Sequence, residues 1–168
     1  HEIDVIAELG EQHFMIECKY HNLPGTFSDV KIPLYIQARF KDVESQWIKL
    51  PGHENKSHTG WVITNTRFST DAIQYGTCAG LKLLGWDYPL KEGLKDIIDQ
   101  LGLYPITCLT TLTKVEKQRL LDKNIVLCKE LSDNTQHLED AGVNTTRFKR
   151  VLEEVERLCE HLILISKI

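Results

Sequence analysis

The chain has 168 residues, enough to bury a hydrophobic core in one domain or in two small ones. Its formal charge of −4 gives no overall argument for nucleic-acid binding, so any DNA contact must come from local basic patches or a bound metal. No apolar run reaches the roughly 18 residues of a membrane span, so we expect no membrane partner.

The five cysteines are widely spaced and include no Cys-x-x-Cys pair. Their odd number argues against a disulfide framework, and a reducing cytoplasm is the simplest setting for them. Cys18 should point into the core, where it acts as a small hydrophobic residue rather than a nucleophile. His53 and His58 lie in a polar loop without a nearby cysteine, so we expect no zinc site there.

Residues 1–22 alternate with period two and predict a β-hairpin. Gly10-Glu11 suits a two-residue turn, because a glycine in the first position tolerates a positive φ. This turn sets a register in which Asp4 lies opposite Glu17. The apolar face, which we expect to join the core, comprises Ile3, Val5, Ala7, Phe14, Ile16, Cys18 and Tyr20. The opposite face gathers Glu2, Asp4, Glu17 and Lys19.

The acidic residues on this polar face suggest metal chemistry. Two carboxylates that face each other across a sheet repel each other, whereas a divalent cation between them reverses the sign of the interaction. Mg²⁺ typically binds through one or two carboxylates plus substrate phosphates, which makes Asp4 and Glu17 candidate ligands. The Lys19 ammonium can orient an attacking water or neutralise phosphate charge. A solvated hairpin face with a Glu–Lys pair is the alternative.

A helix is predicted from Ser28 or Asp29, its candidate N-caps, to about Gln46. Its apolar side chains form one stripe at helical spacing, which is typical of a core-facing helix. Pro33 is compatible with this helix only if it falls in the first turn. Residues 48–59 are polar and predict a loop.

Residues 61–64 predict a buried strand, a helix capped by Ser69 or Thr70 follows, and residues 81–86 predict the next strand. This spacing indicates a right-handed βαβ crossover and a mixed sheet. Arg67 would follow the carboxyl end of the first strand, where open α/β sheets commonly bind ligands. It is therefore a candidate phosphate contact, with a structural salt bridge as the alternative.

The remaining chain predicts helices, the first over residues 91–101. From Pro105 the helices become short, and Thr113-Lys-Val-Glu116 has the pattern of a capping box. Asn144 is expected to cap a long amphipathic helix through about Leu162. The start of that helix offers N–H donors and a favourable dipole to phosphate, with a solvated helix face as the alternative. Its candidate nucleic-acid contacts are Arg147, Lys149 and Arg150.

Asp4, followed by Glu17-Cys18-Lys19 on the next strand, resembles the D…(D/E)xK signature of the PD-(D/E)XK nuclease superfamily, and especially its Mrr-like restriction endonucleases. Residues 60–86, GWVITNTRFSTDAIQYGTCAGLKLLGW, are similar to the strand–helix–strand segment after the catalytic hairpin of that family. The resemblance covers roughly residues 1–90. It implies a restriction-endonuclease-like α/β fold in which a mixed sheet is flanked by helices.

The resemblance also implies a metal-dependent DNA endonuclease that hydrolyses phosphodiester bonds. Asp4, Glu17 and Lys19 would be catalytic, and Asp4, Glu17 and the backbone carbonyl of Cys18 would hold Mg²⁺ or Mn²⁺. Glu2 is an auxiliary candidate that could instead only pair with Lys19. Gln37 is another, because the family often turns polar residues of this helix toward the active site, with solvated surface as the alternative. Cleavage of both strands would usually need two active sites, which favours a homodimer.

Residues 106–163 resemble a helix-hairpin-helix-related module, similar in pattern to the helical C-terminal domain of RNA polymerase alpha subunits. The turn Asn124-Ile125-Val126 lacks the glycine of DNA-binding hairpins, which puts DNA contact through this turn in doubt. The predicted organisation is a nuclease core over residues 1–90, a helix and linker over 91–105, and a helical module over 106–168.

Nuclease domains of this superfamily usually have a helix and a strand before the catalytic hairpin, and these are absent here. We therefore expect either that another segment replaces them or that the chain is part of a longer protein. Some relatives also carry an upstream nucleotide-binding ATP-cone domain.

Two other functions compete with the nuclease. The first is a non-catalytic module on a nuclease-like scaffold, which docks protein or nucleic acid. The intact Asp4, Glu17 and Lys19 favour the enzyme, because a superfamily member that no longer cleaves DNA would more often have lost one of them. The second is a Rossmann-like nucleotide binder, which ranks last because the sequence contains no GxGxxG motif.

Overall fold

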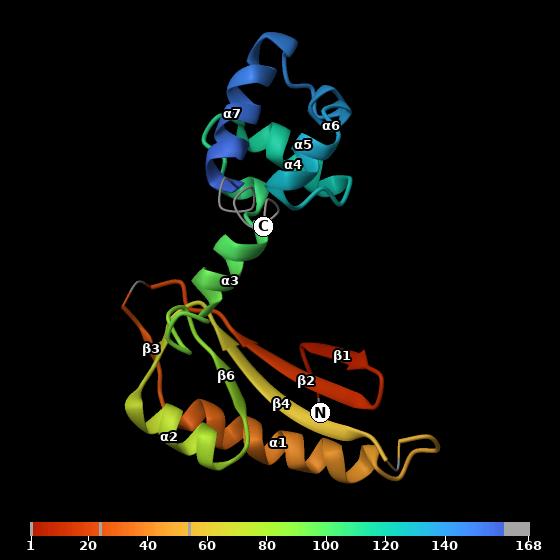
Figure 1. Cartoon of the computed structure of the whole chain (residues 1–168), viewed down its shortest axis with the longest axis vertical. Coiled ribbons are helices and arrows are strands. Elements are labelled where there is room, and N and C mark those ends of the chain that lie inside the picture. The colour runs from red at the N-terminus through yellow and green to blue at the C-terminus, as the bar shows by residue number, and fades with distance from the viewer. Residues whose placement is uncertain (1, 24, 54, 160–168) are drawn as a thin grey trace, which may run out of the picture. The chain divides into compact units, whose positions relative to one another are not determined.

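The computed structural model describes residues 2–23, 25–53 and 55–159. The chain divides into two compact units, His1–Lys95 and Asp96–Ile168, whose elements are labelled in Figure 1. Each unit has its own cluster of buried hydrophobic side chains. The division lies inside the segment 91–105 that the sequence predicts to connect a sheet domain to a helical module. Within the described residues, no helix combines the length and apolarity needed to cross a bilayer.

The first unit is built on a mixed sheet of order β1-β2-β4-β6. Its strands are β1 (Val5–Leu9), β2 (Gln12–Lys19), β4 (Ser57–Thr64) and β6 (Lys82–Leu84). β1 runs antiparallel to β2, and β4 runs parallel to both of its neighbours. A second, two-stranded parallel sheet pairs β3 (Phe27–Ser28) with β5 (Arg67–Phe68). The predicted α/β fold with a mixed sheet is confirmed.

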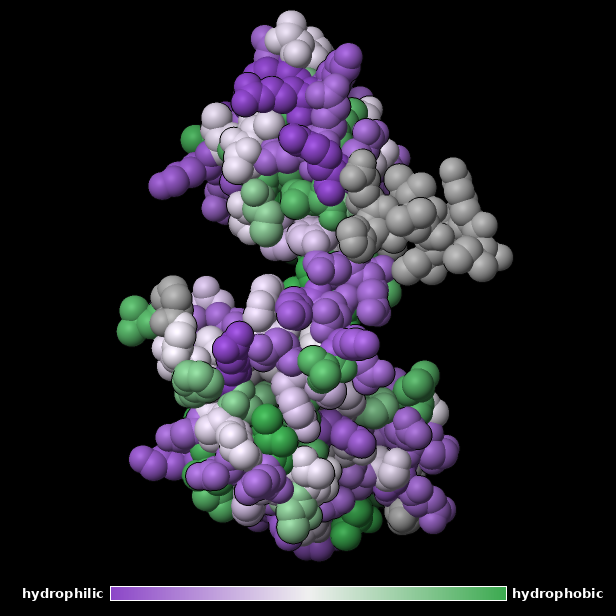
Figure 2. Space-filling model, turned by 60° about the vertical axis from the view of Figure 1, so that its left-hand side comes forward, coloured by the Kyte–Doolittle hydropathy of each residue, from purple (hydrophilic) through white to green (hydrophobic). Residues whose placement is uncertain are grey.

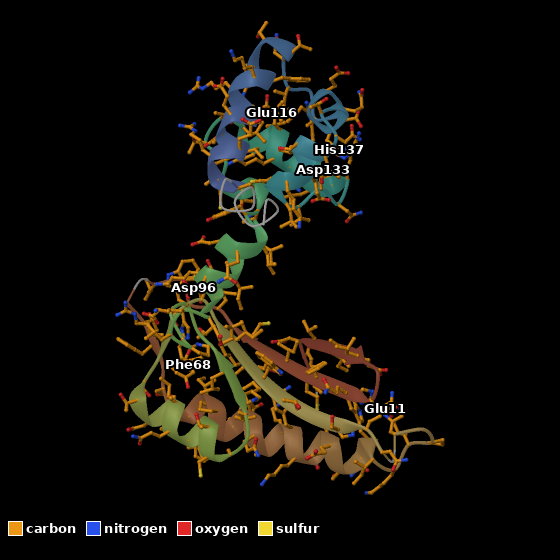
Figure 3. All side chains as sticks on the ribbon, in the orientation of Figure 1. Glu11, Phe68, Asp96, Glu116, Asp133 and His137 are labelled. Carbon is orange, nitrogen blue, oxygen red and sulfur yellow. The ribbon has the colours of Figure 1, made fainter. Side chains whose placement is uncertain are left out.

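Two helices, α1 (Lys31–Trp47) and α2 (Thr70–Cys78), lie along one face of the larger sheet (Figure 1). The predicted N-caps of α1 need correction: Val30 is the N-cap residue and Ser28 lies in β3, although Asp29 Oδ1 accepts the Lys31 N–H at 3.0 Å just before the helix. Ser69 caps α2 by accepting the Ala72 N–H at 3.2 Å. The buried core between helices and sheet contains Met15, Ile36, Phe40, Val62, Ala72, Leu81, Leu83 and Phe68, the last of which is labelled in Figure 3.

The hairpin has the predicted register. Gly10 adopts a positive φ of 57° in the turn, and Glu8 pairs with His13 across the two strands. β1 begins at Val5, so Asp4 lies directly before the strand rather than within it. β4 begins at Ser57, inside the stretch predicted to be loop, because these residues pair with the start of β2.

The prediction of which hairpin face joins the core is wrong. The face of β2 that packs against α1 carries His13, Met15 and Glu17, all of which are buried, whereas Cys18 on the opposite face is exposed. The helices cover the polar face because its charged groups find partners there. Lys56 Nζ lies 3.0 Å from His13 Nε2, and Arg39 of α1 compensates the charge of Glu17.

Gly60 permits the close approach of α1 to β4. A Cβ at this position would lie 2.1 Å from the Phe40 ring and 2.9 Å from Leu81. We therefore expect Gly60→Ala to lower the free energy of unfolding of the first unit by about 1–3 kcal/mol, the usual cost of overpacking a core. Tryptophan fluorescence during urea unfolding measures this, because all three tryptophans, at positions 47, 61 and 86, belong to this unit.

The double variant Phe40→Leu/Gly60→Ala provides the control for this prediction. Because leucine withdraws the ring that an added Cβ would strike, the two substitutions together should cost less than the sum of the single ones. Strict additivity would mean that contact with Phe40 is not the reason for the glycine.

The second unit is helical and has a separate core centred on Leu109, Leu120, Leu131 and Val151. Its elements are α3 (Leu94–Leu101), which begins just before the unit, η1 (Ile106–Cys108), α4 (Lys114–Asp122), α5 (Cys128–Asp133), α6 (Gln136–Asp140), η2 (Thr145–Arg147) and α7 (Phe148–Cys159).

The predicted starts of two of these helices need correction. The first helix begins at Leu94 rather than at residue 91. Asn144 caps the 3₁₀ turn η2, and α7 then begins at Phe148, so the predicted helix from residue 144 is divided. The predicted end at Leu162 lies outside the described residues.

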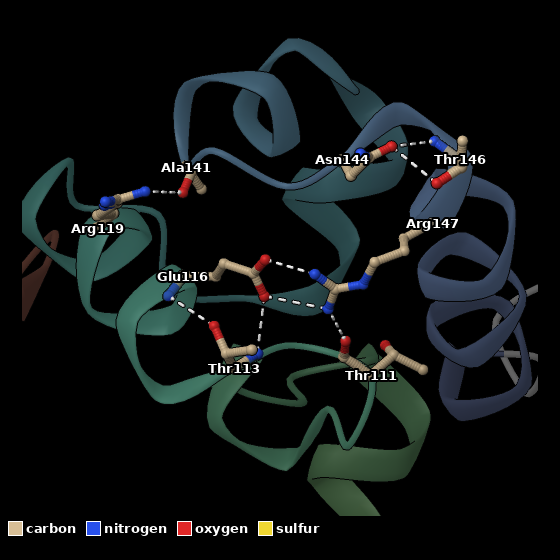
Figure 4. A network of polar contacts seen from close by, with 8 residues as sticks. All are labelled: Thr111, Thr113, Glu116, Arg119, Ala141, Asn144, Thr146 and Arg147. Atoms are coloured by element: carbon tan, nitrogen blue, oxygen red, sulfur yellow. Dashed lines mark hydrogen bonds and ion pairs between the residues drawn. The ribbon is translucent and has the colours of Figure 1, made fainter.

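The predicted capping box at the start of α4 is confirmed. Thr113 Oγ1 accepts the Glu116 N–H at 3.3 Å, and Glu116 Oε2 accepts the Thr113 N–H at 2.8 Å (Figure 4).

Candidate active site

Glu17 is the centre of a charged cluster at the carboxyl end of β2. Its side chain is almost completely buried against α1, where two cations compensate its charge. Lys19 Nζ lies 2.5 Å from Glu17 Oε1, and Arg39 Nη1 lies 3.2 Å and 3.3 Å from the two carboxylate oxygens. Arg39 in turn lies over the ring of Tyr35, 5.3 Å from its centroid. A buried carboxylate without such partners would be strongly destabilising.

Asp4 joins this cluster from the position directly before β1. Its Oδ2 accepts the backbone N–H of Cys18 at 2.7 Å, which holds the carboxylate beside the segment between Glu17 and Lys19. The same charges affect the Cys18 thiol. Partial burial raises the pKa of this thiol, and the carboxylates of Asp4 and Glu17 raise it further, while Lys19 lowers it. The thiol therefore stays protonated at neutral pH.

The structure thus brings together Asp4, Glu17 and Lys19, and it adds Arg39. Gln37 is the predicted auxiliary residue of α1, but Arg39 is the α1 residue that hydrogen bonds Glu17, while Gln37 is half-buried on the same helix. The spacing of Tyr35 and Arg39, four residues apart on one helix face, was the available signal. Glu2, the other auxiliary candidate, is exposed before the hairpin.

The oxygen donors of Asp4 and Glu17 suit a hard divalent cation. Among the described residues, no three histidine, cysteine, aspartate or glutamate side chains are grouped so that they could hold a metal ion. Two carboxylates are nevertheless the usual protein contribution to a Mg²⁺ site, in which water and substrate phosphates complete the coordination. A divalent cation at these carboxylates would compete with Lys19 and Arg39 for the oxygens of Glu17.

The basic candidates outside this cluster have different environments. Arg67 is exposed and its Nε lies 2.8 Å from Asp87 Oδ2, the salt bridge considered as the alternative to phosphate contact. Lys149 is 88% exposed, with only a 3.9 Å ion pair to Glu153, and Arg150 is exposed on the same helix.

Arg147 has a structural role within the second unit. Its guanidinium contacts both oxygens of Glu116, the closer at 2.6 Å, and donates to the Thr111 carbonyl (Figure 4). Burial opposes ionisation of Glu116, but the hydrogen bonds from Arg147 and Thr113 outweigh it and lower the pKa of the carboxyl. Since these contacts occupy the guanidinium, Arg147 is a weaker candidate for DNA contact than its exposed neighbours.

The fold and the cluster define an α/β unit with two carboxylates and two cations at a strand end, joined to a helical unit.

Comparison with known proteins places the chain in a family. Residues 104–159 match the family model described as AF1548-like, C-terminal. An uncharacterized protein from Archaeoglobus fulgidus is 37% identical over 158 residues, which cover 94% of this chain and 84% of the relative. The chain therefore belongs to the AF1548-like family.

A solved structure from the comparison agrees with this assignment. It is described as the crystal structure of the protein of unknown function AF1548, with a TM-score of 0.69 and 35% sequence identity to this chain. The match covers 95% of this chain and 82% of the other. It therefore includes both the α/β unit and most of the helical unit.

Proposed function

We propose that this protein is a metal-dependent DNA endonuclease of the PD-(D/E)XK type. The observation that carries the proposal is the gathering of Asp4, Glu17 and Lys19 around one backbone segment of β2, as the D…ExK pattern requires. An isolated surface Glu–Lys pair would not need a buried glutamate, nor a second carboxylate fixed beside it. The burial of Glu17 thus favours a site over a solvated hairpin face.

The residues of the cluster have distinct roles in this proposal. Asp4 and Glu17 would hold a divalent cation, which when bound polarises a phosphoryl oxygen and lowers the pKa of water. Lys19 places an ammonium where charge develops on the phosphoryl group. Arg39 contacts both carboxylate oxygens of Glu17 and orients the side chain, and it is therefore a positioning residue.

Plasmid DNA tests the proposal directly. The protein should convert supercoiled plasmid to nicked or linear forms in Mg²⁺ or Mn²⁺, and chelation of the metal should stop the reaction. Protein that binds DNA but never cuts it with either ion would support the non-catalytic docking module instead. Linear product from a single binding event would support the homodimer that cleavage of both strands favours.

The five free cysteines support a cytoplasmic location.

Metal binding should also stabilise the fold. Ligand binding to the native state alone raises its stability by about 1.4 kcal/mol at a tenfold excess over Kd. We expect millimolar Mg²⁺ to raise the Tm of the protein, and we expect Asp4→Asn to lose that response because it removes one carboxylate.

Asp29→Asn is the matched control, since the amide keeps an oxygen that can accept the Lys31 N–H at the start of α1. It should retain the full metal response. A response of equal size in Asp4→Asn would place the metal elsewhere.

A further inference from the structure

A pocket of about 510 Å³ lies directly beside the candidate active site. One wall begins at Tyr20, the residue after Lys19, and the other includes Asn65 and Arg67, just beyond the end of β4. Because β2 and β4 are parallel, with Lys19 opposite Thr64, the pocket and the charged cluster share one end of the sheet. Its volume lies in the range of pockets that bury small ligands.

Exposed aromatic rings gather around this pocket. Tyr20, Phe27 and Trp86 all line it and are 75%, 56% and 44% exposed. Tyr35, which lies under Arg39, is the other aromatic residue of comparable exposure among the described residues. Hydrophobic side chains reach the surface in scattered patches elsewhere (Figure 2), but three exposed aromatic residues around one hollow indicate a ligand that stacks on rings.

Hydrogen bonds join the two chain segments that line this pocket. The His21 N–H donates to Asn65 Oδ1 at 2.8 Å, and Asn65 Nδ2 donates to the His21 carbonyl at 2.9 Å. The His21 ring is fixed as well, because its Nε2 lies 3.1 Å from the hydroxyl of buried Ser28. These contacts tie the chain after β2 to the chain after β4, so little conformational entropy is lost when a ligand enters.

Arg67 adds a cation to the rim. Its side chain is 65% exposed, and the contact with Asp87 is made through Nε. A guanidinium has further N–H groups that suit phosphate oxygens. The pocket therefore combines stacking surfaces with a hydrogen-bond donor for phosphate oxygens. Proteins that bind single-stranded nucleic acids use this combination.

We propose that this pocket takes an unpaired nucleobase of a DNA strand whose adjacent phosphate lies at Glu17 and Lys19. The inference rests on the proposed function for its substrate, and it specifies that substrate as DNA with a single-stranded or extruded base at the cleavage point. Stacking on Tyr20, Phe27 and Trp86 accepts any base, because every base offers a π-face.

Fluorescence anisotropy with labelled oligonucleotides in EDTA tests the pocket without any need for cleavage. The probes are an oligothymidylate strand, an abasic strand of equal length with the same phosphates, and RNA of the same sequence. The wild-type protein should bind the base-containing DNA strand about tenfold more tightly than the abasic strand. Trp86→Ala should lose most of that difference. Leu9→Ala, which removes a 72% exposed side chain at the hairpin turn, should keep it.

Several outcomes would overturn the inference. Equal affinity of the wild-type protein for the two DNA strands would remove the evidence for base contact. A preference that survives in Trp86→Ala and in the more exposed Tyr20→Ala would place the contact elsewhere, and Tyr20→Ala also serves if Trp86→Ala fails to fold. RNA bound as tightly as DNA would contradict the choice of DNA. Since no metal is present, base-dependent binding can hold even if plasmid cleavage fails, so the two proposals fail separately.

Discussion

Lys19→Ala is expected to abolish cleavage of plasmid DNA in Mg²⁺ while the protein remains folded. The ammonium lies 2.5 Å from Glu17 Oε1, beside the carboxylates that would hold the cation. Loss of one preorganised group that stabilises transition-state charge typically costs about 10²–10³ in rate. A nicking assay at fixed salt measures this loss.

Binding and folding should change much less than the rate. One phosphate contact among several supplies a small share of DNA affinity, so binding at the same salt should fall only modestly. Lys19 is half-buried and contributes little to the hydrophobic core. Cleavage and binding should therefore separate in this variant, which a merely structural role of the lysine would not produce.

Lys56→Ala is the matched control. Lys56 also pairs with a glutamate of the hairpin, Glu8 at 3.2 Å, but at the turn end, away from the cluster. This variant should cut DNA at close to the wild-type rate. Cleavage that survives in Lys19→Ala would mean that the chemistry occurs elsewhere, and the assignment of Glu17-Cys18-Lys19 would be wrong.

Glu154→Gln is expected to destabilise the second unit by about 1.5–3 kcal/mol, the usual range for hydrogen bonds to a charged group. Glu154 of α7 accepts the backbone N–H groups of Thr110 and Thr111 at 2.8 Å and 2.9 Å. It also accepts both threonine hydroxyls. A glutamine amide cannot accept at both positions, so one threonine would lose its partner.

The pH dependence of this effect has a definite sign. Burial opposes ionisation of Glu154, but the four hydrogen bonds dominate and lower its pKa from 4.5 to about 2. A lowered carboxyl pKa stabilises the native state above the unfolded pKa, and that stabilisation is lost as the pH falls toward the native value. The difference between wild type and Glu154→Gln should therefore be full at neutral pH and should shrink between pH 4.5 and about 2.

Urea unfolding followed by circular dichroism reports this change, while tryptophan fluorescence, which arises only from the first unit, should stay unchanged. Glu153→Gln is the control, because that side chain is 56% exposed and makes only the long ion pair with Lys149. Equal stability of wild type and Glu154→Gln at pH 7 would contradict the role given to these hydrogen bonds.

The sequence by itself determined the features that depend on neighbouring residues. Gly10-Glu11 set the register of the hairpin because a two-residue turn leaves one pairing. Ser69 and the pair Thr113 and Glu116 marked helix starts, since each cap forms within three residues. These predictions succeed because each interaction joins residues that are only a few positions apart in the sequence.

Only the tertiary structure decided which face of the hairpin is buried and what surrounds Glu17. The alternation in β2 offered two faces, and the more apolar face was the wrong choice because α1 packs on the other and supplies Arg39, 22 residues from Glu17. Arg147 of η2 and Glu116 of α4, 31 residues apart, likewise meet only through tertiary packing. A buried charge is tolerated only where an oppositely charged side chain contacts it. Helix packing, rather than the local sequence pattern, determines where such a contact forms.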